Sequence, residues 1–175
     1  MDNSFEQCVR KPDYTQDNKK YSLYRVLMII SIIGAAVGLL LVFMGLYYIG
    51  AIDAVLWGGI AFLFYRLMDG AIIEYDYEFS DGAIRIARIS NRAKRKELAA
   101  LMLDAVEAIA PYNKGDVEKY TADGSRKLLD CTLNSDSRWY YILASQNGKK
   151  LFVLWEPKQE LLKLIRNERR QLVTL

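Results

Sequence analysis

The sequence contains no histidine among its 175 residues, and it contains only two cysteines. Histidine is the commonest general base and a usual zinc ligand, so histidine-dependent triads and HExxH metal sites are excluded. Cys8 and Cys131 lie in unrelated regions, which excludes a disulfide framework and a four-cysteine metal site. GxGxxG and Walker loops are also missing. The sequence therefore predicts a protein that is not an enzyme, without catalytic residues, a metal site or a cofactor.

Charged residues are almost absent from residues 26–65, where Asp53 is the only one. Val26–Ile49 is an apolar run of about two dozen residues, which is long enough for a helix to cross a bilayer. Polar residues precede this run, and the run is longer than the apolar part of a typical signal peptide. We therefore interpret it as a transmembrane helix.

A second, shorter apolar run ends near Arg66. Counted from Ala51 to Met68 it has about 18 residues, which spans a bilayer marginally, and the Arg66 side chain can extend toward the interface. These flanks favour a second crossing over a re-entrant segment. We expect a transmembrane hairpin within residues 21–70, with helices at about 23–49 and 51–69.

The charges beside the two helices predict an orientation. The link between the helices, around Gly50–Asp53, carries no basic residue, whereas several basic residues precede the first helix. These are Arg10, Lys11, Lys19, Lys20 and Arg25. By the positive-inside rule, we expect a multi-pass protein of the cell membrane with both termini in the cytoplasm. Residues 1–20 are then a cytoplasmic N-terminal tail.

Glycines in the hairpin predict close helix packing. Gly34, Gly38 and Gly45 fall on one face of the first helix at 100° per residue. A smooth stripe of this kind allows two helices to approach closely. It packs either against Gly58 and Gly59 of the second helix or against a second copy of the chain in a homo-oligomer.

Beyond Gly70 the apolar residues alternate with polar ones, which is typical of a half-buried strand. The apolar residues are Ile73, Tyr75, Tyr77 and Phe79, and the polar ones are Glu74, Asp76 and Glu78. We expect the three carboxylates to be solvated on the outer face. Asp81-Gly82 predicts a two-residue turn that places Glu78 opposite Arg85.

The remaining chain predicts further strands and a C-terminal helix at about 157–172. The strands are Lys96–Leu101, which could equally form a short helix, Val106–Tyr112, Lys127–Thr132, Arg138–Ser145 and Lys149–Trp155, with a polar loop at 113–126. A turn at Asn147-Gly148 would place Tyr141 opposite Leu154. The predicted fold class is α+β: a transmembrane hairpin, then a domain at 71–175 with a seven-stranded antiparallel barrel or sandwich capped by the helix.

Three segments carry a family resemblance: YDYEFSDGAIRI, RAKRKEL and DAVEAI. They resemble the first strands of bacterial pleckstrin-homology-like (PH-like) domains attached to membrane hairpins, over about residues 71–172. The resemblance implies a scaffold that binds lipid or protein without known chemistry. Lipid-binding domains of this fold have basic residues around the first hairpin, and here that hairpin is Ser80-Asp81-Gly82. A specific inositol phosphate pocket is therefore not expected.

An up-and-down strand path places basic loops near the membrane and acidic loops away from it. The residues predicted to meet the lipid surface are Arg92, Lys94, Arg95, Lys96, Lys149 and Lys150. Anionic headgroups attract such residues by about 1 kcal/mol each. The alternative is that these are ordinary solvated loop residues. Because the basic loops lack interleaved aromatic residues, we do not expect nucleic-acid binding.

These observations predict a non-enzymatic scaffold or binding module at the inner membrane surface. Its expected partners are membrane lipid, with anionic headgroups, and a membrane or cytoplasmic protein. The alternative function is a small subunit of an oligomeric membrane transport or channel complex, assembled through the glycine stripe.

Overall fold

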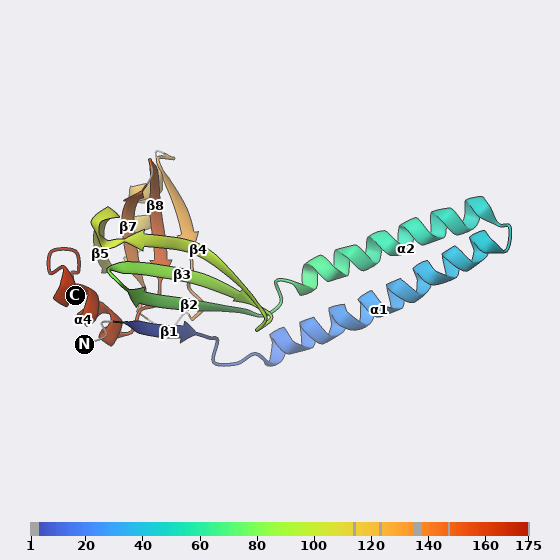
Figure 1. The fold of residues 1–175 in the computed structure, drawn as a ribbon, viewed down its shortest axis with the longest axis horizontal. Helices are drawn as coiled ribbons and strands as arrows, with labels where there is room; N and C mark the ends of the chain where they lie inside the picture. The colour runs from blue at the N-terminus through green and yellow to red at the C-terminus, as the bar shows by residue number, and fades with distance from the viewer. Residues whose placement is uncertain (1–3, 114, 123, 135–137, 147, 175) are drawn as a thin grey trace. The chain divides into compact units, whose positions relative to one another are not determined.

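The computed structural model describes residues 4–113, 115–122, 124–134, 138–146 and 148–174 (Figure 1). The chain forms two compact units, a helical one at residues 13–73 and a β-rich one that combines residues 1–12 with residues 74–175. We call them the helical hairpin and the β-domain. The hairpin is thus inserted into the β-domain, and the first residues, predicted to be a tail, belong to that domain.

The helical hairpin consists of α1 (Thr15–Phe43) and α2 (Tyr47–Met68). At 1.5 Å per residue, their 29 and 22 residues extend about 43 and 33 Å, enough by length and composition to cross a membrane. The turn between them contains Gly45, whose φ of 93° ends α1. The link predicted at Gly50–Asp53 instead lies within α2. The prediction was wrong because the residues that follow Gly45 are apolar, so the sequence gives no polar signal for the turn.

The first sheet of the β-domain has the order β1-β2-β3-β4. Its strands are β1 (Phe5–Val9), β2 (Ile73–Ser80), β3 (Ala83–Ser90) and β4 (Lys94–Met102). β1 runs antiparallel to β2, with Val9 opposite Tyr75. The hairpin therefore connects two neighbouring strands. β1 was not predicted, because one of its inward-facing residues is the polar Gln7, which interrupts the apolar alternation.

The second sheet has the order β5-β7-β8-β6. Its strands are β5 (Val106–Pro111), β6 (Arg126–Asp130), β7 (Tyr140–Gln146) and β8 (Lys149–Trp155), and η1 (Leu103–Ala105) connects the two sheets. β6 runs parallel to β8. The predicted α+β class, with two apolar helices, a sheet domain and a C-terminal helix, is confirmed. Of the predicted seven-stranded antiparallel barrel or sandwich, the closed barrel, the strand count and the purely antiparallel pairing were wrong, because the described chain has eight strands in two sheets that do not close into a barrel.

The core contains aromatic and branched side chains from both sheets. Its largest fully buried members include Tyr77, Phe79, Ile84, Ile142 and Trp155. The predicted register of the last two strands is confirmed, because Tyr141 lies opposite Leu154 and Tyr140 opposite Trp155. Of the turn predicted at Asn147-Gly148, Asn147 lies outside the described residues.

The C-terminal helix α4 (Gln159–Glu168) lies beside the sheets and buries Leu161, Leu162 and Ile165 (Figure 1). It ends earlier than predicted. Leu172–Thr174 instead run along β5, where the Leu172 carbonyl accepts from the Ile109 N–H and the Thr174 N–H donates to the Ile109 carbonyl. This short pairing covers part of the β5 edge.

The segment predicted as a polar loop contains α3 (Asp116–Thr121). Tyr120 of α3 lies over Tyr141 and Phe152, with ring centroids 5.6 and 5.9 Å away. Tyr141 is therefore buried on the outer face of the second sheet. Lys114 and Asp123 of the same segment lie outside the described residues.

Candidate functional site

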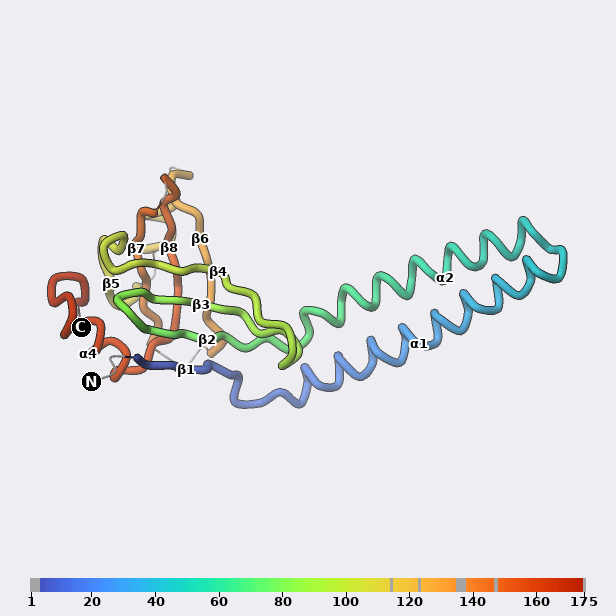
Figure 2. Tube along the Cα trace, viewed as in Figure 1, coloured from blue at the N-terminus to red at the C-terminus, as the bar shows by residue number. Residues whose placement is uncertain are grey.

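The six residues predicted to meet lipid lie at two separate turns. Arg92, Lys94, Arg95 and Lys96 belong to the turn between β3 and β4 or to the start of β4, and their side chains are exposed. Lys149 and Lys150 begin β8 in the other sheet. Figure 2 shows these two turns at different corners of the β-domain. The structure therefore does not bring the six residues into one surface.

Arginines pair with the carboxylate row of β2: Arg10 follows β1, and Arg92 and Arg95 lie at or near the β3–β4 turn. Glu74 and Asp76 were expected to be solvated, but they are only 2% and 4% exposed. The paired atoms are Arg10 Nε and Glu74 Oε2 at 3.2 Å, Arg92 Nε and Glu74 Oε1 at 3.6 Å, and Arg95 Nη2 and Asp76 Oδ2 at 2.8 Å. The expectation was wrong because it treated the outer face as open, whereas arginines from both sides cover it.

Glu78 completes this charged network. Arg85 Nη1 donates to Glu78 Oε1 at 3.0 Å, which places the two residues side by side as the turn predicted. Partial burial raises the pKa of Glu78, but hydrogen bonds from Ser80, Arg95 and Arg85 outweigh it and hold that pKa below its ordinary value. Glu78 is therefore ionised at neutral pH, and Arg95 bridges it to Asp76.

The predicted glycine stripe is only partly a packing surface. A Cβ on Gly34 would lie 2.7 Å from the Trp57 ring, and one on Gly38 would lie 2.5 Å from the backbone nitrogen of Ala54. These two glycines therefore let α1 and α2 approach closely. Gly45 lies in the turn between the helices, and Cβ atoms on Gly58 or Gly59 would meet nothing within 4 Å among the described residues. A homo-oligomer through the glycines stays a prediction.

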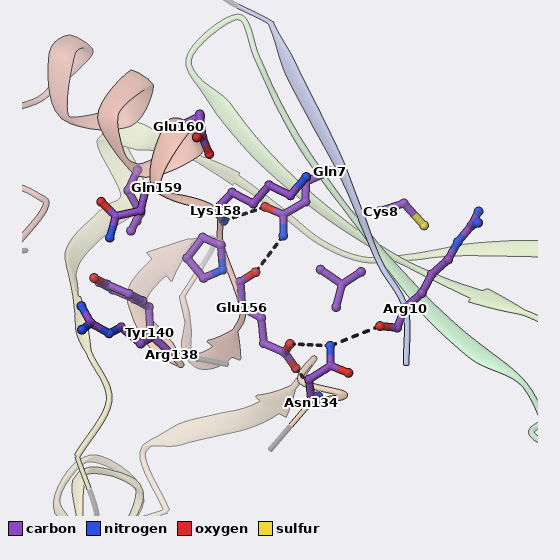
Figure 3. Close-up of a pocket in the computed structure, with 13 residues that line it drawn as sticks. Gln7, Cys8, Arg10, Asn134, Arg138, Tyr140, Glu156, Lys158, Gln159 and Glu160 are labelled. Carbon is purple, nitrogen blue, oxygen red and sulfur yellow. Dashed lines mark hydrogen bonds between the residues drawn. The ribbon is translucent and has the colours of Figure 1, made fainter. Parts of the chain in front are cut away.

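A cavity of about 540 Å³ lies at the edge of β1 (Figure 3). The cavity is widely open to solvent, and three segments that are distant in sequence line it: the residues of β1, those that precede and begin β7, and those that lead into α4. Its size falls within the range of about 300–1,000 Å³ that is common for small-molecule sites. None of its residues was selected from the sequence as a site residue.

Gln7 and Glu156 fix the walls of this cavity. The Gln7 amide donates to the Glu156 carbonyl at 2.9 Å and accepts from the Lys158 N–H at 2.7 Å, so it joins β1 to the start of α4. The buried Glu156 carboxylate accepts from the backbone N–H groups of Leu133 and Asn134 and from the Asn134 side chain. Both polar groups are thus used for structure, and the cavity is held in shape before any ligand binds.

Three other polar side chains of the cavity, those of Arg138, Tyr140 and Lys158, do not hold segments of the chain together. Arg138 and Lys158 have exposed side chains that make no ion pair or hydrogen bond with another described residue. Tyr140 is buried, and its hydroxyl likewise has no described partner. In Figure 3, Arg138 and Tyr140 extend toward the same side of the cavity. These groups donate hydrogen bonds and carry positive charge, which suits binding rather than acid–base chemistry.

The described residues contain no group of three or more metal-ligating side chains. Of the two thiols, Cys8 is exposed at the cavity and Cys131 is buried. Burial raises the pKa of Cys131 to about 12, which keeps that thiol protonated and unreactive near neutral pH.

Comparison with known families gives one match. The model of a family described as a bacterial PH-like domain (DUF6106) matches residues 5–175. No curated protein and no solved structure matches the chain. The predicted resemblance is confirmed, and the match is longer than the predicted 71–172 because it begins at β1 and includes the helical hairpin.

Proposed function

The chain belongs to the bacterial PH-like domain family DUF6106, and we propose that it is a non-enzymatic binding module anchored in a membrane by its helical hairpin. One observation supports this function most strongly: the two apolar helices connect strands β1 and β2, which pair in one sheet. A hairpin in this position anchors the domain at two points, both at the same end of that sheet.

The covalent links limit how far this sheet end can lie from the anchor. Residues 10–14 join β1 to α1, and residues 69–72 join α2 to β2. Five extended residues reach at most about 18 Å. Ser90 pairs with Lys94 at this same end of the sheet, so the β3–β4 turn belongs to it as well. We propose that this end faces the membrane and that the β-domain, with both termini, lies on the cytoplasmic side.

The orientation can be tested with the native thiols. A membrane-impermeant maleimide is expected to label the exposed Cys8 only after cells are permeabilised, while the buried Cys131 stays unlabelled. In a Cys8→Ser background, Met44→Cys places a thiol in the turn between the helices and should be labelled in intact spheroplasts. Labelling of Cys8 in intact spheroplasts would overturn the proposed orientation.

The β3–β4 turn is proposed to touch anionic headgroups. Because Arg92 and Arg95 already pair with carboxylates, exposed lysines such as Lys96 supply the attraction. A fluorophore on Ala93→Cys in a Cys8→Ser background would report this contact in nanodiscs. We expect a blue shift with phosphatidylglycerol, which Lys96→Glu reduces by roughly half and the matched change Lys127→Glu on β6 leaves unchanged. Equal emission in phosphatidylglycerol and phosphatidylcholine would refute lipid contact.

A further inference from the structure

We propose that the cavity beside β1 is a binding site for an oxyanion, a phosphate or carboxylate group, carried by a ligand with a small apolar part. The cavity is formed entirely by the β-domain, so this inference goes beyond membrane anchoring and does not depend on it. Three features of the described residues lead to it: an unused buried hydroxyl, two unpaired cations and the start of a helix.

The buried hydroxyl belongs to Tyr140. This residue is only 5% exposed, yet its hydroxyl makes no hydrogen bond with another described residue. Among the described side chains, this hydroxyl is not one of the polar atoms sealed from solvent, so solvent reaches it, and Tyr140 lines the cavity. Buried polar groups are nearly always hydrogen-bonded. A ligand atom that accepts a hydrogen bond would satisfy this hydroxyl.

The two cations come from opposite walls. Arg138 precedes β7 and Lys158 precedes α4, and neither side chain is paired within the described chain. Figure 3 shows the Arg138 guanidinium and the Tyr140 hydroxyl on the same side of the cavity, below Gln159. A guanidinium presents parallel N–H groups that match the oxygens of phosphate and carboxylate. Arg138 together with the Tyr140 hydroxyl therefore favours an oxyanion over a neutral acceptor.

The start of α4 adds donors of the same kind. Lys158 is the N-cap of this ten-residue helix, and no side chain caps it. The first N–H groups of a helix have no partner within the helix, and the helix dipole there favours negative charge. The N–H of Lys158 itself is taken by Gln7, so the N–H groups that follow it are the ones left for a ligand.

The acidic residues of the cavity do not reverse this preference. The Glu156 carboxylate is already occupied by N–H groups of Leu133 and Asn134. Glu160 is exposed, and Figure 3 shows it apart from Tyr140 and Arg138. Val9 and Leu162 form a buried apolar part of the wall, which suits a ligand with a short hydrocarbon portion. The ligand is therefore either the headgroup of an anionic lipid or a soluble organic phosphate or carboxylate.

Calorimetric titration of the full chain in phosphatidylcholine nanodiscs with inorganic phosphate tests the site directly. We expect saturable binding that sodium chloride at equal ionic strength does not reproduce. Arg138→Gln should weaken phosphate binding about tenfold, and Tyr140→Phe, which keeps the ring packed, about threefold. Arg166→Gln is the matched control, because this exposed arginine lies in the last turn of α4, away from the cavity.

The outcomes separate the site from general charge effects and the two ligand sources from each other. Equal weakening by Arg138→Gln and Arg166→Gln, or the same heat with chloride, would overturn the proposal. Thermal melting without phosphate checks that each variant folds as the native chain does. If the natural ligand is a headgroup, phosphatidylglycerol in the nanodisc will compete with inorganic phosphate. If it is a soluble molecule, the lipid will not compete and glycerol phosphate in solution will.

Discussion

A chain that begins at residue 71 is expected not to fold stably, whereas a chain in which residues 12–72 are replaced by Asn-Gly is expected to form the β-domain. The difference between the two chains is β1. The first chain lacks this strand altogether, while the second joins it to β2 directly. Val9 lies opposite Tyr75, so a two-residue turn between residues 11 and 73 continues the antiparallel register.

The expected effect is large because β1 contributes more than its length suggests. Removing it exposes the edge of β2, whose Tyr77 and Phe79 are fully buried, and it also removes the buried Val9. Burial of one such aliphatic side chain stabilises by about 1.5–3 kcal/mol. Gln7 is lost as well, and with it both hydrogen bonds that hold the segment before α4. Because domain stabilities are only about 5–15 kcal/mol, the combined loss of this side chain, these hydrogen bonds and the pairing of β1 with β2 is a large fraction of the total.

Urea unfolding followed by circular dichroism would measure the difference between the two chains. The chain with the Asn-Gly turn should give a cooperative transition, and the chain beginning at residue 71 should give none or one shifted to much lower urea. A further control restores residues 1–11 to the truncated chain as a separate peptide, which should recover part of the structure. A cooperative transition with the same midpoint in both chains would show that β1 is dispensable.

The strands whose two faces differ in polarity were predictable, and β1 shows why others were not. Alternation and the turn signals gave β2, β3 and the register of β7 with β8, because an error of one residue would turn every apolar side chain outward. In β1, however, the inward position of Gln7 is satisfied by hydrogen bonds from another segment. A buried polar residue whose hydrogen bonds come from a segment distant in sequence cannot be recognised from the alternation of apolar and polar residues.

The charged surface could be predicted in composition but not in pairing. The sequence identified the carboxylates of β2 and the basic turn as separate features. Their ion pairs depend on Arg10 and Arg92 meeting at Glu74, and these residues come from the two sides of β2 in the sheet. The cavity was unpredictable for the same reason, since Tyr140, Arg138 and Lys158 come together with Gln7 only when β1 takes its place.

Gly38→Ala is expected to separate the two helices of the hairpin, although it adds only one methyl group. A Cβ at this position would lie 2.5 Å from the Ala54 backbone nitrogen and 2.8 Å from Asp53 Oδ2. The nearest atom is backbone, so no side-chain rotation relieves the overlap and the helices must move apart. Overpacking of this kind costs about 1–3 kcal/mol. Gly59→Ala is the matched control, because its Cβ would meet nothing within 4 Å among the described residues.

Cross-linking measures this separation within one chain. Tyr24 and Phe64 stack at 6.3 Å between ring centroids, so cysteines at these positions in a Cys8→Ser background should lie within reach of a short bifunctional maleimide in membranes. Gly38→Ala should lower the yield severalfold, and Gly59→Ala should leave it unchanged. If Gly59→Ala instead lowers a cross-link between two chains, the exposed glycines of α2 join copies of the protein. An unchanged yield of the cross-link between positions 24 and 64 in Gly38→Ala would contradict the prediction. It would show that α1 and α2 do not approach closely at Gly38 and that this glycine does not stabilise the hairpin.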